Sequence, residues 1–295
     1  MMRRLLNKPL FRPPAEADSL ILQIDEGCPY NRCTFCGMYR DTRFREKSLP
    51  EIRLLIEQES AGAPEAKRVF LADGDVMRRP FEDLQLILES LAQYLPMLAR
   101  VNVYATGNAL VAKTNTQLRS LRSLKMNTLY MGLESGDKIT LLNVHKAETA
   151  EIMVEACNRA QECGLKMSVM FLLGLGGVVR SQEHAEATAL VLNRMQPRLL
   201  SALRIVPVAG TDLYKDLNAG RFVQLTEYAI VQELRTVISL LDLNNTVFRA
   251  NHASNVVPIE ARFPRDKSKL LADLDEMLAS GFLDKNSPGA MPLWL

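Results

Sequence analysis

The stretch Gly27–Gly37 reads GCPYNRCTFCG and carries three of the five cysteines of the chain. These three, Cys28, Cys33 and Cys36, fall within nine residues. The apolar run Leu20–Ile24 precedes the stretch and is typical of a buried β-strand, which places the cysteines on the loop that leaves the strand. Three thiolates on one tight loop can hold three corners of a metal cluster and leave the fourth corner open, as in a catalytic rather than a structural metal site.

An iron–sulfur cluster normally takes four cysteine ligands, so one iron of a cluster on this loop would be open to another molecule. The alternative is a zinc knuckle or a group of buried thiols. Zinc would require a fourth Cys or His at short range, and the next such residue after Cys36 is His145. Cys157 and Cys163 lie on a predicted helix over residues 149–163. They point about 120° apart on such a helix and are typical of buried small apolar residues.

The composition is that of a globular chain. Its 295 residues are 47% apolar and 24% charged, and a single barrel domain of about 200–250 residues would fit within them. The net charge of +2 gives no case for a nucleic-acid partner. Five cysteines in a chain of this length do not form a disulfide framework, so we expect a reducing, cytoplasmic location. Residues 1–8 are basic but lack the apolar stretch of a signal peptide, and we expect no transmembrane segment.

Strand and helix signals alternate along the chain. Strands are predicted near residues 19–25, 67–72, 99–105, 127–133, 167–173 and 199–206, and helices near 49–61, 80–95, 115–123, 149–163, 180–194 and 225–242. This alternation predicts right-handed crossovers and a parallel sheet. We therefore expect an α/β fold, a partial (β/α)6 barrel of the TIM type. The expected organisation is an N-terminal arm (1–18), a core barrel (19–243) and a C-terminal strand and helix extension packing on the barrel (244–295).

Polar and glycine-rich residues follow the predicted strands. The first strand leads into Cys28, and the later strands lead into residues 73–75, 104–108, 132–137, 174–177 and 204–211. Glycine after a strand is usually turn punctuation. In β/α barrels, however, the carboxyl ends of the strands form the face that carries chemistry. Six such stretches in chain order, with the cysteine loop first, favour a functional face.

The cysteine loop and these strand ends together resemble the radical S-adenosylmethionine (radical SAM) superfamily. Its members hold a [4Fe-4S] cluster by three loop cysteines, usually spaced C-x3-C-x2-C, and SAM chelates the fourth iron. Here the spacing is C-x4-C-x2-C, with an aromatic residue, Phe35, just before the last cysteine. The resemblance implies that Cys28, Cys33 and Cys36 ligate iron.

The resemblance also implies a SAM site. Residues 73–75 stand where the superfamily has a GGE strand end that binds the methionine amine, with Asp in place of Glu at the third position. Glu134 stands near the expected ribose, Gly174 where the adenine passes the backbone, and Phe35 against the adenine. The alternative for Asp75 and Glu134 is an acid at a helix N-terminus. The implied cofactor-binding residues are Phe35, Asp73, Gly74, Asp75, Asn108, Glu134, Lys146, Gly174 and Arg204.

Two of these side chains have open alternatives. Lys146 could reach the SAM carboxylate or be solvated. Arg204 could face an anionic group on SAM or substrate, and it would need a partner if it were buried.

The region after residue 243 holds a further polar stretch. A short strand beginning at Thr246 runs into Arg249, Asn251, His252 and Asn255. Arg249 and His252 are candidate catalytic residues, because imidazole titrates near neutrality. The alternative is a polar surface loop with capping side chains. A helix is expected within residues 264–281.

The function that the resemblance implies is reductive cleavage of SAM. A low-potential electron donor of the flavodoxin or ferredoxin type reduces the cluster under anaerobic conditions, and a 5′-deoxyadenosyl radical then abstracts hydrogen from a substrate. A small-molecule substrate is favoured, because no second cysteine set and no extra domain for RNA or cobalamin is visible. Two alternatives remain open. One is a non-catalytic cluster- or SAM-binding carrier or chaperone for haem or metal, and the other is a zinc-binding structural protein.

Overall fold

The computed structural model describes residues 10–290, which divide into two compact units. The first unit comprises residues 10–31, 38–130 and 159–165, and the second comprises residues 32–37, 131–158 and 166–290. Residues 1–9 of the expected N-terminal arm and residues 291–295 of the expected extension lie outside the described residues. The domain boundaries expected from the sequence, at 18/19 and 243/244, stay predictions.

Three parallel strands and the start of a fourth form the sheet of the first unit. They are β1 (Leu20–Gln23), β4 (Arg68–Ala72), β5 (Arg100–Tyr104) and the first part of β6 (Met126–Glu134). Leu20 pairs with Val69, and Arg68 pairs with Arg100. The strands are rich in β-branched and aromatic residues, as a buried parallel sheet requires. The sheet order follows the chain order, which agrees with the predicted crossovers.

Helices and short elements complete the first unit. They are η1 (Pro14–Glu16), β2 (Asp25–Glu26), β3 (Arg45–Glu46), α1 (Leu49–Ala61), η2 (Val76–Arg78), α2 (Phe81–Tyr94), α3 (Gly107–Val111) and α4 (Asn115–Ser123). The side chain of Ser48 and that of Glu51 cap α1 reciprocally. Glu16 fixes the segment before β1, because its buried carboxylate accepts hydrogen bonds from Tyr130 and Asn102. The core includes Phe70, Ala72 and Tyr130.

The second unit contains the strands that follow along the chain. It holds the rest of β6, β7 (Lys166–Leu173), β8 (Leu199–Arg204), β9 (Thr246–Arg249) and β10 (Glu260–Phe263). β7, β8 and β9 are parallel neighbours, whereas β10 runs antiparallel to β9. Within the described residues, the sheet order is β1-β4-β5-β6-β7-β8-β9-β10. The six strands expected from the sequence are therefore extended by two strands from the region after residue 243.

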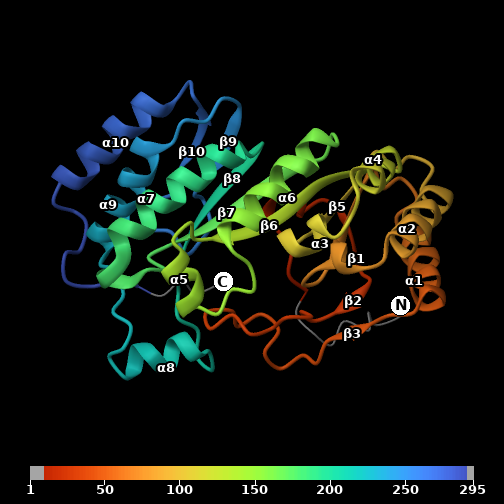
Figure 1. The fold of residues 1–295 in the computed structure, drawn as a ribbon, viewed down its shortest axis with the longest axis horizontal. Helices are drawn as coiled ribbons and strands as arrows, with labels where there is room; N and C mark the ends of the chain where they lie inside the picture. The colour runs from red at the N-terminus through yellow and green to blue at the C-terminus, as the bar shows by residue number, and fades with distance from the viewer. Residues whose placement is uncertain (1–9, 291–295) are drawn as a thin grey trace. The chain divides into compact units, whose positions relative to one another are not determined.

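The helices after β6 are α5 (Lys138–Asn143), α6 (Ala150–Glu162), α7 (Gly177–Met195), α8 (Asp212–Asn218), α9 (Glu227–Leu240) and α10 (Lys267–Ala279). α6 passes from the second unit into the first at residue 159. α9 packs against both α7 and α10 (Figure 1). No helix within residues 10–290 combines the length and the apolar character needed to cross a bilayer.

Candidate functional site

The beginning of the cysteine loop is fastened to the end of β4 in the first unit. Gly27 donates its N–H to Oδ2 of Asp73 at 3.2 Å, and its carbonyl accepts from the N–H of Gly74 at 3.1 Å. A Cβ at Gly74 would lie 2.6 Å from the Cα of Cys28, so only glycine allows this approach. Cys28 is partly exposed, and its Sγ accepts from the N–H of Asn31 at 3.5 Å. The first cysteine is therefore placed by backbone contacts with a neighbouring strand end.

Asp73 directly follows β4, is fully buried and is hydrogen-bonded to the first residue of the cysteine loop. Its Oδ2 also accepts from Nε2 of Gln23 at 2.7 Å, while its Oδ1 is buried without a hydrogen-bond partner. Burial raises the pKa of this carboxyl group above its ordinary value. Asp73 lies close to Tyr39, whose pKa is raised by burial and by the Asp73 charge. Oδ1 of Asp73 would suit a ligand donor group such as an amine, in competition with the neighbouring Tyr39 hydroxyl, whose hydrogen bonding also acts on the pKa of Asp73.

Asp75 connects the ends of β4 and β5. Its carboxylate accepts from Thr106 twice, from the N–H at 3.2 Å and from Oγ1 at 2.7 Å. It is the N-cap residue of η2 but makes no side-chain cap bond there, so both interpretations of Asp75 stay open. Asn108 is exposed on α3, the short helix capped by Thr106.

The end of the cysteine loop is anchored in the second unit. Thr34 donates its N–H to the carbonyl of Val144 at 3.0 Å and accepts from the N–H of Leu213 at 3.0 Å. Cys33 and Cys36 flank this anchored segment in a tight turn, in which Cys36 N–H donates to the Cys33 carbonyl at 3.2 Å. Phe35 packs on an apolar cluster of Val144, Leu175, Ile205 and Leu213. All five cysteines are thiols without a disulfide, and those of the loop are partly exposed.

Glu134 and Lys146 form an ion pair at the end of β6. Nζ of Lys146 lies 3.4 Å from Oε1 of Glu134, and both side chains are 13% exposed. Burial lowers the pKa of Lys146, but the neighbouring charges of Glu134 and Cys33 outweigh burial, and the pKa is raised. A Cβ at Gly132 would lie 2.0 Å from Oε1 of Glu134, so this carboxylate lies directly on the backbone. Lys146 is therefore not the solvated lysine of the alternative interpretation.

Gly174 ends β7 with a left-handed φ of 79°. Its N–H donates to Oε1 of Glu233 on α9 at 2.6 Å. A Cβ at this position would lie 2.8 Å from Cδ1 of Ile230 and 3.3 Å from Cγ2 of Ile205. The contact of Gly174 with the adenine, expected from the resemblance, stays a prediction. In the structure, the space beside Gly174 is filled by isoleucine side chains.

Gly174 is surrounded by a buried polar network, and the sequence did not predict this network. Oε2 of Glu233 accepts from Oγ of Ser181 at 2.5 Å, and His184 bonds the Leu172 carbonyl through Nε2 at 3.0 Å. Nδ1 of His184 bonds Oγ of Ser135, just after β6, at 2.7 Å. Burial raises the pKa of Glu233, and the nearby His184 opposes that rise. The sequence held no signal for this network, because a glutamate within a predicted helix is usually an exposed polar residue.

The remaining candidates each have local partners. Arg204 donates to the carbonyls of Pro288 at 2.5 Å and Ala290 at 3.2 Å, while its Nε is buried without a hydrogen-bond partner. Arg249 is exposed and lies 3.5 Å from Glu260 on β10. His252 is half-buried, and burial lowers its pKa. Because the N–H of Ser254 donates to Nδ1 of His252 at 3.2 Å, Nδ1 is an acceptor and Nε2 carries the ring proton.

The sequence matches the family model described as Radical SAM superfamily over residues 22–188. This match spans more than half of the chain, and the chain belongs to the radical SAM superfamily. Enzymes of this superfamily cleave SAM with a [4Fe-4S] cluster, and they need an electron donor and a substrate. No curated protein sequence matches the chain.

Solved structures support the same fold class. Methylornithine synthase (PylB) is 16% identical with a TM-score of 0.53, over 88% of this chain and 81% of that chain. Elp3 from the archaeon Methanocaldococcus infernus is 14% identical with a TM-score of 0.53, over 88% and 64%. The FeFe-hydrogenase maturase HydG from Carboxydothermus hydrogenoformans is 19% identical with a TM-score of 0.50, over 86% and 56%. At these identities the likeness shows the fold, an α/β radical SAM core with a mostly parallel sheet.

The residues of the chain fit the cofactors of this superfamily. Within residues 10–290, no three His, Cys, Asp or Glu side chains are gathered as they would be around a bound metal ion. The donor set is nevertheless three thiols on one loop, which is the chemistry of an iron–sulfur ligand set. The buried, unpaired Oδ1 of Asp73 follows directly on the strand whose end touches Cys28. An acceptor without a partner at that place suits a ligand with a donor group.

Proposed function

We propose that this chain is a radical SAM enzyme in which Cys28, Cys33 and Cys36 ligate a [4Fe-4S] cluster. When bound, the cluster and SAM would supply reductive cleavage of SAM to a 5′-deoxyadenosyl radical that abstracts hydrogen from a small-molecule substrate. The observation that supports this proposal best is the packing of Gly74 directly on Cys28. It joins the cysteine loop to a strand end with a buried, unpaired acceptor, in a chain that belongs to this superfamily.

The side chains of the chain itself would bind and orient SAM. Oδ1 of Asp73 would accept a hydrogen bond from the methionine amine, because it is the free acceptor at this strand end. Glu134, held by Lys146, would accept from the ribose hydroxyls. Phe35 would contact the adenine from the cysteine loop, beside the apolar cluster on which it packs.

His252 and Arg249 would act on the substrate. Because Nδ1 of His252 accepts from the N–H of Ser254, Nε2 is the ring nitrogen that would donate a hydrogen bond to a substrate. Arg249 is exposed and lies three residues before His252 in the chain, and it would bind an anionic group of the substrate. The electron donor would be a low-potential flavodoxin or ferredoxin in a reducing compartment such as the cytosol, because the loop thiols are partly exposed.

Anaerobic turnover without added substrate tests the proposal. The chain is reconstituted with iron and sulfide, reduced with dithionite and given SAM, and 5′-deoxyadenosine is quantified over time. We expect slow formation that is abolished in Cys28→Ala, Cys33→Ala and Cys36→Ala. The matched control is Cys163→Ala, because Cys163 is buried and donates only to the Asn115 carbonyl. It should retain full iron content.

Two results would count against the proposal. Full iron content in any one of the three loop variants would remove that cysteine from the ligand set. A reducible cluster that yields no 5′-deoxyadenosine, and whose EPR signal does not change with SAM, would favour the carrier function.

A further inference from the structure

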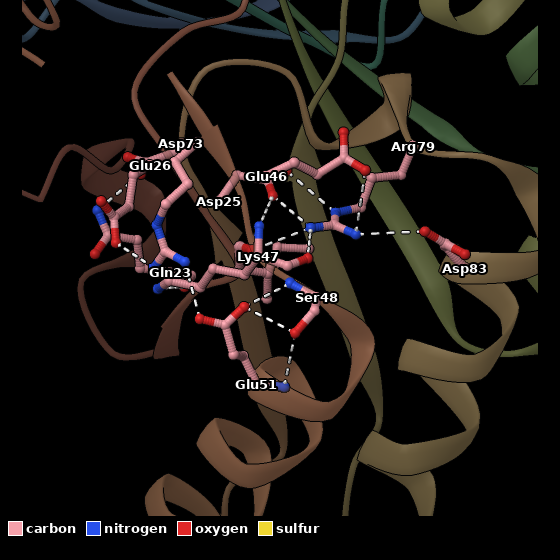
Figure 2. Close-up of polar contacts among 12 residues, drawn as sticks. Gln23, Asp25, Glu26, Glu46, Lys47, Ser48, Glu51, Asp73, Arg79 and Asp83 are labelled. Atoms are coloured by element: carbon pink, nitrogen blue, oxygen red, sulfur yellow. Dashed lines mark hydrogen bonds and ion pairs between the residues drawn. The ribbon is translucent and has the colours of Figure 1, made fainter. Parts of the chain in front are cut away.

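A buried arginine of the first unit forms hydrogen bonds to the segment of residues 23–27, which leads into the cysteine loop. Arg79 follows η2 and is only 2% exposed. It holds Asp25 with two prongs, Nε to Oδ2 at 3.2 Å and Nη2 to Oδ1 at 2.5 Å. The same Nη2 also reaches the main-chain carbonyls of Ile24 at 3.3 Å and Lys47 at 2.7 Å. Figure 2 shows this guanidinium among its carboxylate partners.

The segment is held by other charged groups as well. Nζ of Lys47 donates to the carbonyl of Gln23 at 2.5 Å, and the N–H of Lys47 donates to Asp25 at 3.3 Å. Asp73 accepts from Gln23 and from Gly27, the residue before Cys28. From the last residue of β1 to the residue before the first cysteine, polar contacts therefore restrain four residues, which are Gln23, Ile24, Asp25 and Gly27. Figure 2 shows Gln23 and Asp25 among these contacts.

Stability alone is a weak explanation for such a pair. A buried ion pair contributes little net stability, because desolvation of the two charges offsets their attraction, and apolar replacement of both is often neutral. The guanidinium of Arg79 also donates two hydrogen bonds to main-chain carbonyls. The Ile24 carbonyl lies four residues before Cys28. The Lys47 carbonyl directly follows β3, the strand that pairs with β2. The contacts define a conformation of this segment.

We infer that Arg79, through Asp25, is a positioning residue for the iron–sulfur cluster, an inference that rests on the proposed function. The side chain of Arg79 donates to carboxylates and main-chain carbonyls. It sets the path of the main chain from β1 into Gly27 and thereby the direction in which Cys28 presents its thiolate. Partners one step removed from metal ligands orient those ligands, and their loss typically lowers metal affinity about 10- to 100-fold.

The test uses two variants and a matched control. Arg79→Lys keeps the positive charge but loses the planar, two-pronged geometry. Arg79→Met combined with Asp25→Leu removes both charges together and leaves no buried charge unpaired. The control is Arg45→Met. Arg45 also binds two carboxylates, Glu26 and Glu51, each at 2.8 Å, but its side chain is 47% exposed and its contacts reach no main-chain carbonyl of the segment.

The measurements are made on the full chain after anaerobic reconstitution. They are the iron content, the rate of iron loss to a chelator, the EPR spectrum of the reduced cluster and the melting temperature of the cluster-free chain. We expect both Arg79 variants to lose iron at least about tenfold faster than the wild type and to show an altered EPR spectrum. Arg45→Met should match the wild type in both respects. If the double variant does not fold, Arg79→Lys decides.

Unchanged iron loss and an unchanged EPR spectrum in the folded Arg79 variants would overturn the inference, as would equal effects in Arg45→Met. The two proposals fail in distinguishable ways. A wild-type chain that takes up no cluster contradicts the proposed function. A wild-type chain that binds the cluster and cleaves SAM, with Arg79 variants that bind the cluster equally well, contradicts only the role of Arg79.

Discussion

At the scale of single residues, three strand ends of the eight-stranded sheet hold a residue in the left-handed region. They are Asp73 after β4, Glu134 at the end of β6 and Gly174 after β7, with φ of 86°, 64° and 79°. For a residue other than glycine this conformation costs about 1–3 kcal/mol, and such strain collects at functional sites. Each of the three is secured by a polar contact, to Gly27, Lys146 and Glu233 respectively. The strained positions coincide with positions that the sequence predicted for SAM binding.

Replacing Asp73 by Asn should separate its two roles. An Asn side chain has one acceptor oxygen, which can still serve Gln23 and Gly27, and it tolerates a left-handed φ. Its amide group would then place a donor where Oδ1 now offers an acceptor. We expect Asp73→Asn to keep its iron and to bind SAM at least about tenfold more weakly, because a buried donor would face the ligand amine. SAM titration followed by EPR of the reduced cluster measures this affinity.

Asp75→Asn is the control for this prediction, because Asp75 has both of its bonds to Thr106. Its replacement should change SAM binding less than Asp73→Asn does. Wild-type affinity in Asp73→Asn would show that the unpaired oxygen of Asp73 meets no donor of SAM.

At the scale of secondary-structure elements, short capped helices follow the strand ends. α5 is an example, because Asp137 caps it by accepting from the N–H groups of Ile139 and Thr140. The same carboxylate binds Arg180 of α7 with two prongs, at 2.8 and 3.0 Å. Burial acts to raise the pKa of Asp137, but the bonds from Arg180 and Thr140 outweigh burial and lower the pKa to about 2.

This lowered pKa predicts a pH-dependent stability. An acid whose pKa is depressed on folding stabilises the folded state above its unfolded pKa, here 3.8, and that stabilisation is lost as the pH falls through about 2. We expect Asp137→Asn to lower the free energy of unfolding by about 1–2 kcal/mol at pH 6, including part of the cap. The difference from the wild type should shrink as the pH falls toward 2. Urea unfolding of the cluster-free chain at several pH values measures it.

Asp266→Asn serves as the comparison, because the pKa of Asp266 is also lowered to about 2, by Arg265 and by the N–H of Arg262. That pair lies on the surface, where ion pairs contribute little. A loss in Asp266→Asn equal to that in Asp137→Asn, or a difference for Asp137→Asn that does not depend on pH, would contradict the role given to Asp137.

At the scale of the whole molecule, the two ends of the cysteine loop are fixed without any metal. Gly27 is hydrogen-bonded to the two residues that directly follow β4 in the first unit. Thr34 is hydrogen-bonded to Val144 and Leu213 in the second unit. We therefore expect chelation of iron to leave the far-UV circular dichroism of the chain nearly unchanged. Small zinc domains behave differently, because they unfold without their metal. A loss of most of the helical signal on anaerobic chelation would show that the cluster itself maintains the fold.

The sequence by itself determined the elements and the class of the fold. Hydrophobic periodicity placed α1 and α4 at the residues where the structure has them. The three-cysteine loop pointed to the superfamily because its cysteines lie within nine residues of the chain. Helices such as α3 and α5 were missed, since five or six residues at a strand end show too little periodicity.

Only the tertiary structure decided which polar groups meet. Arg79 and Asp25 lie 54 positions apart, and Glu233 and Gly174 lie 59 apart, so no local pattern announces either contact. The isoleucines that pack beside Gly174 likewise come from α9 and from the residue after β8, and no pattern near the glycine announces them. Local patterns depend on neighbours in the chain, whereas the partners of a buried charge depend on which elements fold against one another.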